Sequence, residues 1–247
     1  MTRLRLPRAL AAHSAGLLLL VAALASHAAE RPGGYLQGDL PALVELLAPP
    51  PLAGSDEEHA ELQAVLALQR SRTPSQAEAA AADAEVSPFR FADVLGPAFA
   101  RERVPLTAAL LDGTADDLRG STRAAKDHWN RPRPAVLSPE VTALAEAHGG
   151  SYPSGHATYA YVAAIVLARM LPERQADLFA RARRYADNRV VAGVHFPSDV
   201  EAGRIAGTVI ADRLLAHPDF QRDLDAARVE LRAALGYPDP SERQEPR

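Results

Sequence analysis

The residues best suited to chemistry are cations and histidines that occur in three short segments of the sequence. Arginine offers a planar fork of N–H donors and lysine a compact charge, so together they could surround a tetrahedral oxyanion. Histidine adds a group that can attack an electrophile or exchange a proton near neutral pH. These residue types predict an anion site that carries its own nucleophile. The candidates are Lys126, Arg133, Ser154, Gly155, His156, Arg189, His195 and Asp199.

Lys126 is the only lysine among the 27 lysines and arginines of the chain. Because the sequence uses arginine for every other side-chain cation, a single lysine indicates a functional position. A surface lysine without a function is the alternative.

The second segment, Pro153-Ser154-Gly155-His156, precedes an apolar run that favours a helix. The first turn of a helix has N–H groups without partners and a partial positive charge, which suit a bound phosphate. His156 would lie beside that anion, where it could donate a proton. A capped helix start with a buried histidine is the structural alternative.

The third segment places His195 four residues before Asp199, and Pro197 between them indicates that a helix begins there. Asp199 could accept a hydrogen bond from one ring nitrogen of His195 and fix its tautomer, which leaves the other nitrogen free to attack. The same pair could instead bind a metal ion. Since the three cations named above would crowd a dication, we expect neither a metal nor another cofactor.

Helix-start signals dominate the rest of the sequence, and alternating strand patterns are hard to find. We therefore predict an all-α fold, a single-domain bundle of about eight helices with short loops. Capping residues stand before four expected helix starts, at Ser55 with Glu58, Thr73-Pro74, Ser87-Pro88 and Ser138-Pro139. The expected helices cover residues 58–70, 75–84, 106–129 (with possible breaks at Gly113 and Gly120), 141–148, 154–170, 173–191, 198–216 and 220–235.

The first residues have the order of a secretory signal peptide: arginines, an apolar run over residues 16–25, and small residues at Ser26 and Ala28. That run of about ten residues is short of the roughly 20 that span a bilayer. We expect cleavage after Ala28 and a periplasmic protein without stable membrane insertion. The expected organisation is a signal peptide at 1–28, an extended proline-rich arm at 29–54, the main domain at 55–236 and a frayed tail at 237–247.

Composition narrows the function further. With 247 residues, 47% of them hydrophobic, the chain can bury one substantial core. The absence of cysteine excludes disulfides, cysteine-ligated metals and thiol catalysis. Loss of residues 1–28 would remove three arginines and no acid, and would move the formal net charge from −4 to −7. Nucleic acid is therefore not expected as a partner.

The three segments, in this order and spacing, resemble the signature of the phosphatidic acid phosphatase type 2 and vanadium haloperoxidase superfamily. The matching pattern is Lys126, six residues, Arg133-Pro134; then Pro153-Ser154-Gly155-His156; then Arg189, five residues, His195, three residues, Asp199. Within it, the chain most resembles the bacterial class A nonspecific acid phosphatases. That resemblance implies an exported, all-helical, metal-independent enzyme that hydrolyses phosphate monoesters, and it is compatible with a homo-oligomer.

The resemblance also implies a role for each matching residue. His195 would be the nucleophile that forms a phosphohistidine, and Asp199 would orient it. His156 would be the general acid that protonates the leaving alcohol. The need for a protonated His156 predicts a preference for acidic pH. The residues implied to bind the phosphoryl oxygens are Lys126, Arg133, Ser154, Gly155 and Arg189.

Some positions depart from the pattern or leave alternatives open. Asn188 stands where the signature usually has serine. Trp129 or Tyr152 could line the pocket against an aromatic leaving group, or only pack between helices. The basic run at 181–184 favours a solvated helix face. Alternative functions are a vanadium haloperoxidase, a lipid phosphatase, and a phosphate-binding protein without turnover.

Overall fold

The computed structural model describes residues 34–36 and 38–238. The predicted signal peptide and residues 239–247 of the predicted tail lie outside them. The described part is helical and has no strand, which confirms the all-α prediction. Its α-helices of eight or more residues are α3 (Asp56–Ser71), α4 (Pro74–Ala82), α6 (Pro105–Asp112), α7 (Ala115–Trp129), α9 (Gly155–Met170), α10 (Gln175–Val191), α11 (Pro197–Ala216) and α12 (Pro218–Ala234). The shorter ones are α2 (Leu43–Leu46), α5 (Ala92–Leu95) and α8 (Pro134–Leu137), with 3₁₀ turns η1 (Pro88–Phe91) and η2 (Pro172–Arg174).

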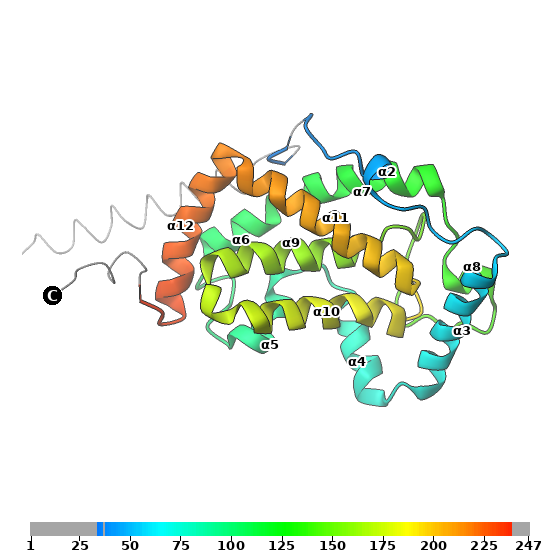
Figure 1. Ribbon diagram of the computed structural model, residues 1–247. Helices are drawn as coiled ribbons and strands as arrows, with labels where there is room; N and C mark the ends of the chain where they lie inside the picture. Colours follow the sequence, from blue (N-terminus) through cyan, green and yellow to red (C-terminus); the bar gives the residue numbers. More distant parts are fainter. Residues whose placement is uncertain (1–33, 37, 239–247) are drawn as a thin grey trace, which may run out of the picture.

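Helix α9 lies in the middle of the molecule, with α10 and α11 packed along it (Figure 1). Its sequence is rich in alanine, and its side chains from Ala157 to Met170 are mostly buried. Small side chains let neighbouring helices approach α9 closely while leaving few voids. The described part of the predicted arm packs on this bundle through Tyr35, Leu43 and Leu47, which are buried.

Two glycines bring α11 very close to α9. A Cβ atom at Gly203 would lie 2.6 Å from the Ser154 carbonyl oxygen, and one at Gly207 would lie 2.6 Å from that of Thr158. Neither position has room for a larger residue without a backbone shift. Close contact here matters because the two helices carry the second and third predicted segments at their first turns.

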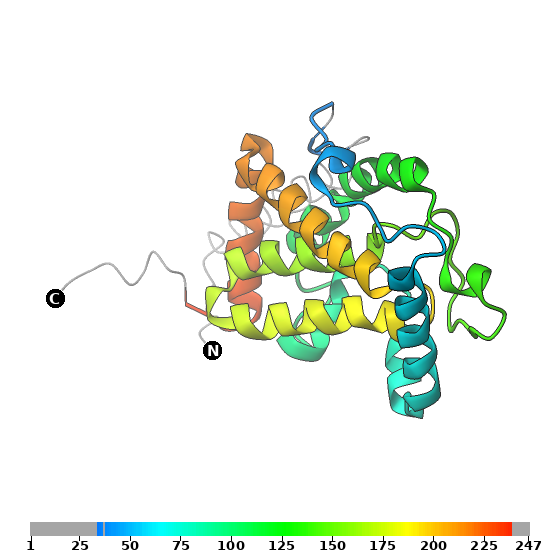
Figure 2. The ribbon, with the colours of Figure 1, turned by 45° about the vertical axis from the view of Figure 1, so that its right-hand side comes forward.

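The start of α9, the end of α10 and the start of α11 meet at one end of the bundle, and α12 lies at the opposite end (Figures 1 and 2). Ser154 caps α9, since its Oγ accepts a hydrogen bond from the Ala157 N–H at 3.3 Å. The Ser154 N–H in turn donates to the Asp199 carbonyl at 2.9 Å, which ties the two helix starts together. Among the described residues, no helix is both long and apolar enough to span a bilayer.

The structure contradicts the helix predicted over residues 141–148, which forms bends and irregular turns. Ser138 and Pro139 accordingly start no helix. The physical reason lies in what this stretch contacts: the Leu144 N–H donates to Ala192, and the carbonyls that follow, at His148 and Gly149, accept hydrogen bonds from a side chain of the site described below. Tertiary contacts thus outweigh the helix propensity of a short segment.

Other boundary predictions are partly correct. The break at Gly113 separates α6 from α7, whereas Gly120 lies inside α7 without interrupting it. Thr73 forms a complete capping box with Gln76. Ser55 accepts from the Glu58 N–H, but the Glu58 carboxylate turns to the Gly54 N–H instead of closing the box.

Candidate active site

The structure brings His195 and Asp199 together at the start of α11, as their spacing predicts. His195 Nδ1 lies 3.2 Å from Asp199 Oδ2, and both side chains are buried. Because a carboxylate only accepts, Nδ1 carries the hydrogen and Nε2 keeps its lone pair. Burial lowers the pKa of His195 to about 3, although the Asp199 carboxylate opposes this shift. His195 is therefore neutral at ordinary pH, with Nε2 able to attack.

Nε2 of His195 faces a cation. Arg133 Nη1 lies 3.3 Å from it and also donates to the Val194 carbonyl at 2.8 Å. The remaining nitrogens of Arg133 donate to the carbonyls of His148, Gly149 and Gly150. These carbonyls fix the guanidinium beside the candidate nucleophile, where it can attract an anion.

The Asp199 carboxylate accepts hydrogen bonds from four partners, of which the sequence predicts only His195. Oδ2 accepts from His195, from the Phe196 N–H at 2.8 Å and from the Ser151 hydroxyl, and Oδ1 accepts from Arg131 at 2.6 Å. Burial favours the neutral acid, but the hydrogen bonds from His195 and Ser151 and the charge of Arg131 outweigh it and lower the pKa of Asp199 to about 2. The carboxylate is thus ionised and held in one orientation.

Arg131 is a residue of this network that sequence reasoning missed. Its guanidinium is almost fully buried, donates to Glu61 at 2.7 Å as well as to Asp199, and lies 4.1 Å from the centre of the Phe196 ring. Glu61 also accepts from the Ser198 N–H at 2.6 Å. One arginine therefore connects α3 to the first turn of α11.

Lys126 stands in the last turn of α7 and lies close to the other predicted cations. Its Nζ donates to the Gly150 carbonyl at 2.8 Å. Burial and the nearby charge of Arg133 lower the pKa of Lys126 to about 8, and Asp199 opposes the shift. An anion bound between these two cations would raise that pKa again, because it would offset their mutual repulsion.

His156, in the first turn of α9, is held by a backbone carbonyl. Its Nε2 lies 3.0 Å from the Ala84 oxygen, and since a carbonyl only accepts, Nε2 carries the hydrogen. Burial and the charge of Arg189 lower the pKa of His156 to about 4, and Arg133 adds to the effect. The nitrogen that can gain or lose a proton is therefore Nδ1.

Three successive carbonyls of the segment after α4 accept hydrogen bonds from the site. Asp83 O accepts from Arg189 Nη1 at 3.3 Å, Ala84 O from His156, and Glu85 O from the Tyr185 hydroxyl. We call residues 83–86 the cap segment. The cap segment positions His156 and Arg189 through its backbone carbonyls. Its role could therefore not be predicted from a side-chain motif in the sequence.

The Asp83 carboxylate fixes the cap segment to α10. It accepts from Arg181 at 2.7 and 3.1 Å, from Arg90 at 2.9 Å and from Asn188 Nδ2 at 2.8 Å. Arg181 is thus buried and paired, which shows that the solvated face predicted for the run at 181–184 is wrong at this residue. Asn188, the departure from the usual serine, bonds to the cap segment.

Some of the other predicted residues line a cavity and others lie outside it. The Ser154 hydroxyl caps α9, and its role toward phosphate stays a prediction. A cavity of about 500 Å³ is lined by Lys126, Gly155 and His156, together with residues of α7 and the cap segment. Neither Trp129 nor Tyr152 is among its described lining residues. Their rings pack edge to face at 4.9 Å, and the Tyr152 hydroxyl donates to a carbonyl of the arm.

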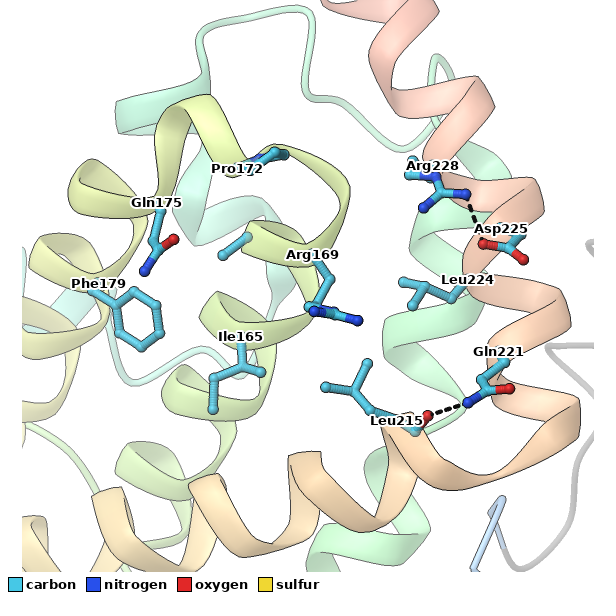
Figure 3. A pocket seen from close by; sticks show the side chains of 11 residues that line it. Ile165, Arg169, Pro172, Gln175, Phe179, Leu215, Gln221, Leu224, Asp225 and Arg228 are labelled. Carbon is cyan, nitrogen blue, oxygen red and sulfur yellow. Dashed lines mark hydrogen bonds and ion pairs between the residues drawn. The ribbon is translucent and has the colours of Figure 1, made fainter. Parts of the chain in front are cut away.

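A larger hollow of about 690 Å³ lies elsewhere, between α9, α10, α11 and α12. Figure 3 shows local bonds at this hollow: Arg228 pairs with Asp225, and Gln221 donates to the Leu215 carbonyl. None of the eight residues predicted for the site is among the described residues that line it. Size alone therefore does not identify the functional cavity.

Comparison with known proteins shows which family the chain belongs to. Residues 106–220 match the PAP2 superfamily. An acid phosphatase of Zymomonas mobilis is 31% identical over 200 residues, which cover 76% of this chain and 75% of that one. The chain belongs to the bacterial class A nonspecific acid phosphatases of the PAP2 superfamily. It is a phosphoric monoester hydrolase, as predicted.

Two further relatives place the phosphatase in the same family. A non-specific acid phosphatase of Providencia stuartii is 31% identical over 201 residues, 75% of this chain and 79% of that one. One from Salmonella typhi is 40% identical over 116 residues, 45% and 46% of the two chains. A transmembrane PAP2-type phosphatidylglycerolphosphate phosphatase from Bacillus subtilis matches 81% of this chain and 92% of its own at 18% identity, with a TM-score of 0.43.

Replacement of Arg131 tests the part of the phosphatase site that the sequence did not predict. Arg131→Ala would leave the buried Asp199 carboxylate and the partly buried Glu61 carboxylate without their cation, so we expect a loss of about 3–5 kcal/mol in the free energy of unfolding. Turnover should fall about 100-fold, because Asp199 loses one of the four hydrogen bonds that orient it toward His195. Arg131→Lys keeps the charge but not the fork, and should be intermediate in both urea unfolding and kcat. Wild-type turnover by a folded Arg131→Ala variant would contradict this role.

The two histidines should make the phosphatase less stable in acid. The unfolded chain protonates His156 near its ordinary pKa of 6.5, whereas the folded chain does so only near 4. Between these values the unfolded state binds more protons, so stability falls as the pH falls, by about 3 kcal/mol from His156 alone. Urea unfolding at pH 7 and pH 4.5 measures the loss. His156→Gln should show a smaller loss, and an equal loss in both proteins would contradict the shift.

Proposed function

We propose that the chain is an exported, metal-independent acid phosphatase that works through a phosphohistidine intermediate. The observation that carries this proposal is the environment of His195: its Nδ1 is bonded to Asp199, and its Nε2 is directed to Arg133. A residue that only binds phosphate as a cation has no need of burial that keeps it neutral, or of a carboxylate that fixes the tautomer in which Nε2 has a free lone pair.

In the first step, His195 Nε2 attacks phosphorus, so a P–N bond forms as the ester P–O bond breaks. The imidazole gains positive charge as it attacks, and the Asp199 carboxylate stabilises that charge through Nδ1–H. His156 donates the proton on Nδ1 to the departing alcohol oxygen. Lys126, Arg133 and Arg189 hold the phosphoryl oxygens as charge moves over them.

In the second step, His156 has lost its proton and accepts one from water through the same Nδ1. The water oxygen attacks phosphorus, the P–N bond breaks, and inorganic phosphate leaves. The Ala84 carbonyl keeps the other proton on Nε2 throughout, so that a single nitrogen serves both steps. Fixed cations in this scheme supply the positive charge that many phosphatases obtain from metal ions.

An acidic optimum follows from the requirement for a protonated His156. The pKa of about 4 is caused first by burial of His156 and then by three cations that repel the imidazolium. A bound phosphate dianion offsets those charges and raises the pKa of His156 toward its ordinary value of 6.5. Activity should then be highest below neutral pH and fall as His156 loses its proton.

The proposal is tested by hydrolysis of ethyl phosphate, whose leaving oxygen needs a proton, by residues 29–247 across pH, with and without EDTA. Activity that resists EDTA, is inhibited by vanadate and declines above neutral pH supports it. The intermediate itself would be trapped by rapid acid-free quenching and mass spectrometry as a phosphate on His195. A rate that requires an added metal, or that rises beyond about pH 8, would overturn this mechanism.

Export rests on the amino-terminal pattern of arginines, apolar run and Ala28 alone. We propose cleavage after Ala28 and release into the periplasm. Expression of the full chain in a Gram-negative host, followed by osmotic-shock fractionation and amino-terminal sequencing, tests both points. A protein that stays in the cytoplasm with its first 28 residues would contradict the proposal.

A further inference from the structure

The cavity of about 500 Å³ beside Lys126 and His156 continues along one face of α7. Lys126, Thr122, Leu118 and Ala115 all line it, and they follow one another at intervals of four, four and three residues. Such intervals place side chains on one face of a helix. Eleven residues of helix extend about 16 Å. This wall is therefore longer than one phosphoryl group, and the cavity has room for another part of a substrate.

The facing wall of the cavity comes from α9 and from the end of the cap segment. Tyr159, one turn after Gly155 on α9, lines the cavity and is 6% exposed, as is Leu118 opposite. Val86, at the end of the cap segment, also lines the cavity. Val86 is 55% exposed, a large apolar side chain open to solvent at the edge of a cavity. Burial of such a side chain against a ligand would be favourable.

Arg119, Arg123 and Asp127 also line the cavity, and their exposed side chains form ion pairs. The Arg119 guanidinium contacts Asp116, and its side chain is 73% exposed. Arg123 lies 3.8 Å from Asp127, and both side chains are more than 70% exposed. The cationic end for phosphate is thus followed by an apolar interior with a charged rim.

We propose that this cavity binds the leaving group, and that the phosphatase prefers phosphate monoesters whose alcohol carries an aromatic or other flat apolar group. The inference rests on the proposed function, because it takes the phosphoryl group to lie at Lys126 and His156. A volume of about 500 Å³ is that of a small-molecule site. Aromatic groups bury a large rigid area at little entropic cost, which suits a cavity lined by side chains of two helices.

The test compares two primary-alcohol esters, 2-phenylethyl phosphate and ethyl phosphate. Their leaving oxygens are chemically alike, so a difference in kcat/KM reports the contact with the remote group and not its reactivity. We expect the phenyl ester to have a kcat/KM higher by about tenfold or more. Equal values would overturn the leaving-group cavity and leave the proposed phosphatase activity intact.

A variant locates the effect. Val86→Ser should lower the ratio of the two kcat/KM values about fivefold, since it removes apolar contact at a position too exposed to affect folding. Val136→Ser is the matched control, because Val136 is also exposed, at 75%, but lies on α8 outside the described lining of the cavity. An unchanged ratio in Val86→Ser would overturn the assignment of this wall.

If the protein hydrolyses neither ester, the proposed function is overturned. The cavity can then be tested without turnover, by calorimetric binding of 2-phenylethylphosphonate and ethylphosphonate to the wild type. Tighter binding of the phenyl compound, weakened by Val86→Ser and not by Val136→Ser, would support the cavity. Equal affinities would overturn it.

Discussion

Replacement of His195 by alanine is expected to lower kcat about 10⁴-fold or more while inorganic phosphate still binds. The proposed nucleophile is Nε2 of this residue, and no other described histidine has both a carboxylate on one ring nitrogen and an arginine on the other. Removal of a nucleophile costs a large part of the chemical acceleration. Lys126, Arg133 and Arg189 remain, so the anion site keeps its charge.

Single-turnover kinetics and phosphate binding by calorimetry measure the two quantities separately. His59→Ala is the matched control, since His59 is exposed on α3 and should keep wild-type kcat. A folded His195→Ala variant that retains substantial turnover would remove the phosphohistidine mechanism. Equal loss of turnover and phosphate binding would favour the alternative of a phosphate-binding protein.

The central pair could be predicted because its geometry is local. A proline at the first position of a helix places His195 just ahead of α11 and Asp199 within it, and four residues of backbone are enough to define their contact. The same holds for His156 at the start of α9. Helix starts are where sequence signals are strongest, since capping residues satisfy N–H groups that have no other partner.

The supporting contacts could not be predicted because they join distant parts of the chain. Asp83 lies 105 residues before Asn188 in sequence and is bonded to it at 2.8 Å. Arg131 looked like one arginine among many, and only the fold shows that it is buried between two carboxylates. The wrong prediction of a helix over 141–148 has the same cause. The backbone of this stretch bonds to Arg133 and Ala192, and the sequence does not show where these residues lie.

Replacement of His156 by glutamine is expected to lower kcat about 10³-fold for an alkyl ester and far less for p-nitrophenyl phosphate. A general acid contributes about 10²–10⁴-fold when the leaving oxygen needs a proton. Nitrophenolate is a stable anion and leaves without one. Measurement of kcat for ethyl phosphate and p-nitrophenyl phosphate in both proteins gives the selectivity of the loss. Equal losses for the two esters would contradict the role of His156 as the acid.

Asp83 extends this prediction to the cap segment. Asp83→Asn keeps the size of the side chain but removes the charge that Arg181 and Arg90 hold, so the Ala84 carbonyl becomes less firmly placed against His156. A merely destabilised protein would lose activity on both esters equally. A misplaced general acid would instead lose more activity on ethyl phosphate than on p-nitrophenyl phosphate, in the same sense as His156→Gln but by about tenfold.

Asn188 donates to the same carboxylate. Asn188→Ala should therefore shift the ratio of activities on the two esters in the same direction by a smaller factor. Asn188→Ser would show whether the usual residue at this position places His156 equally well.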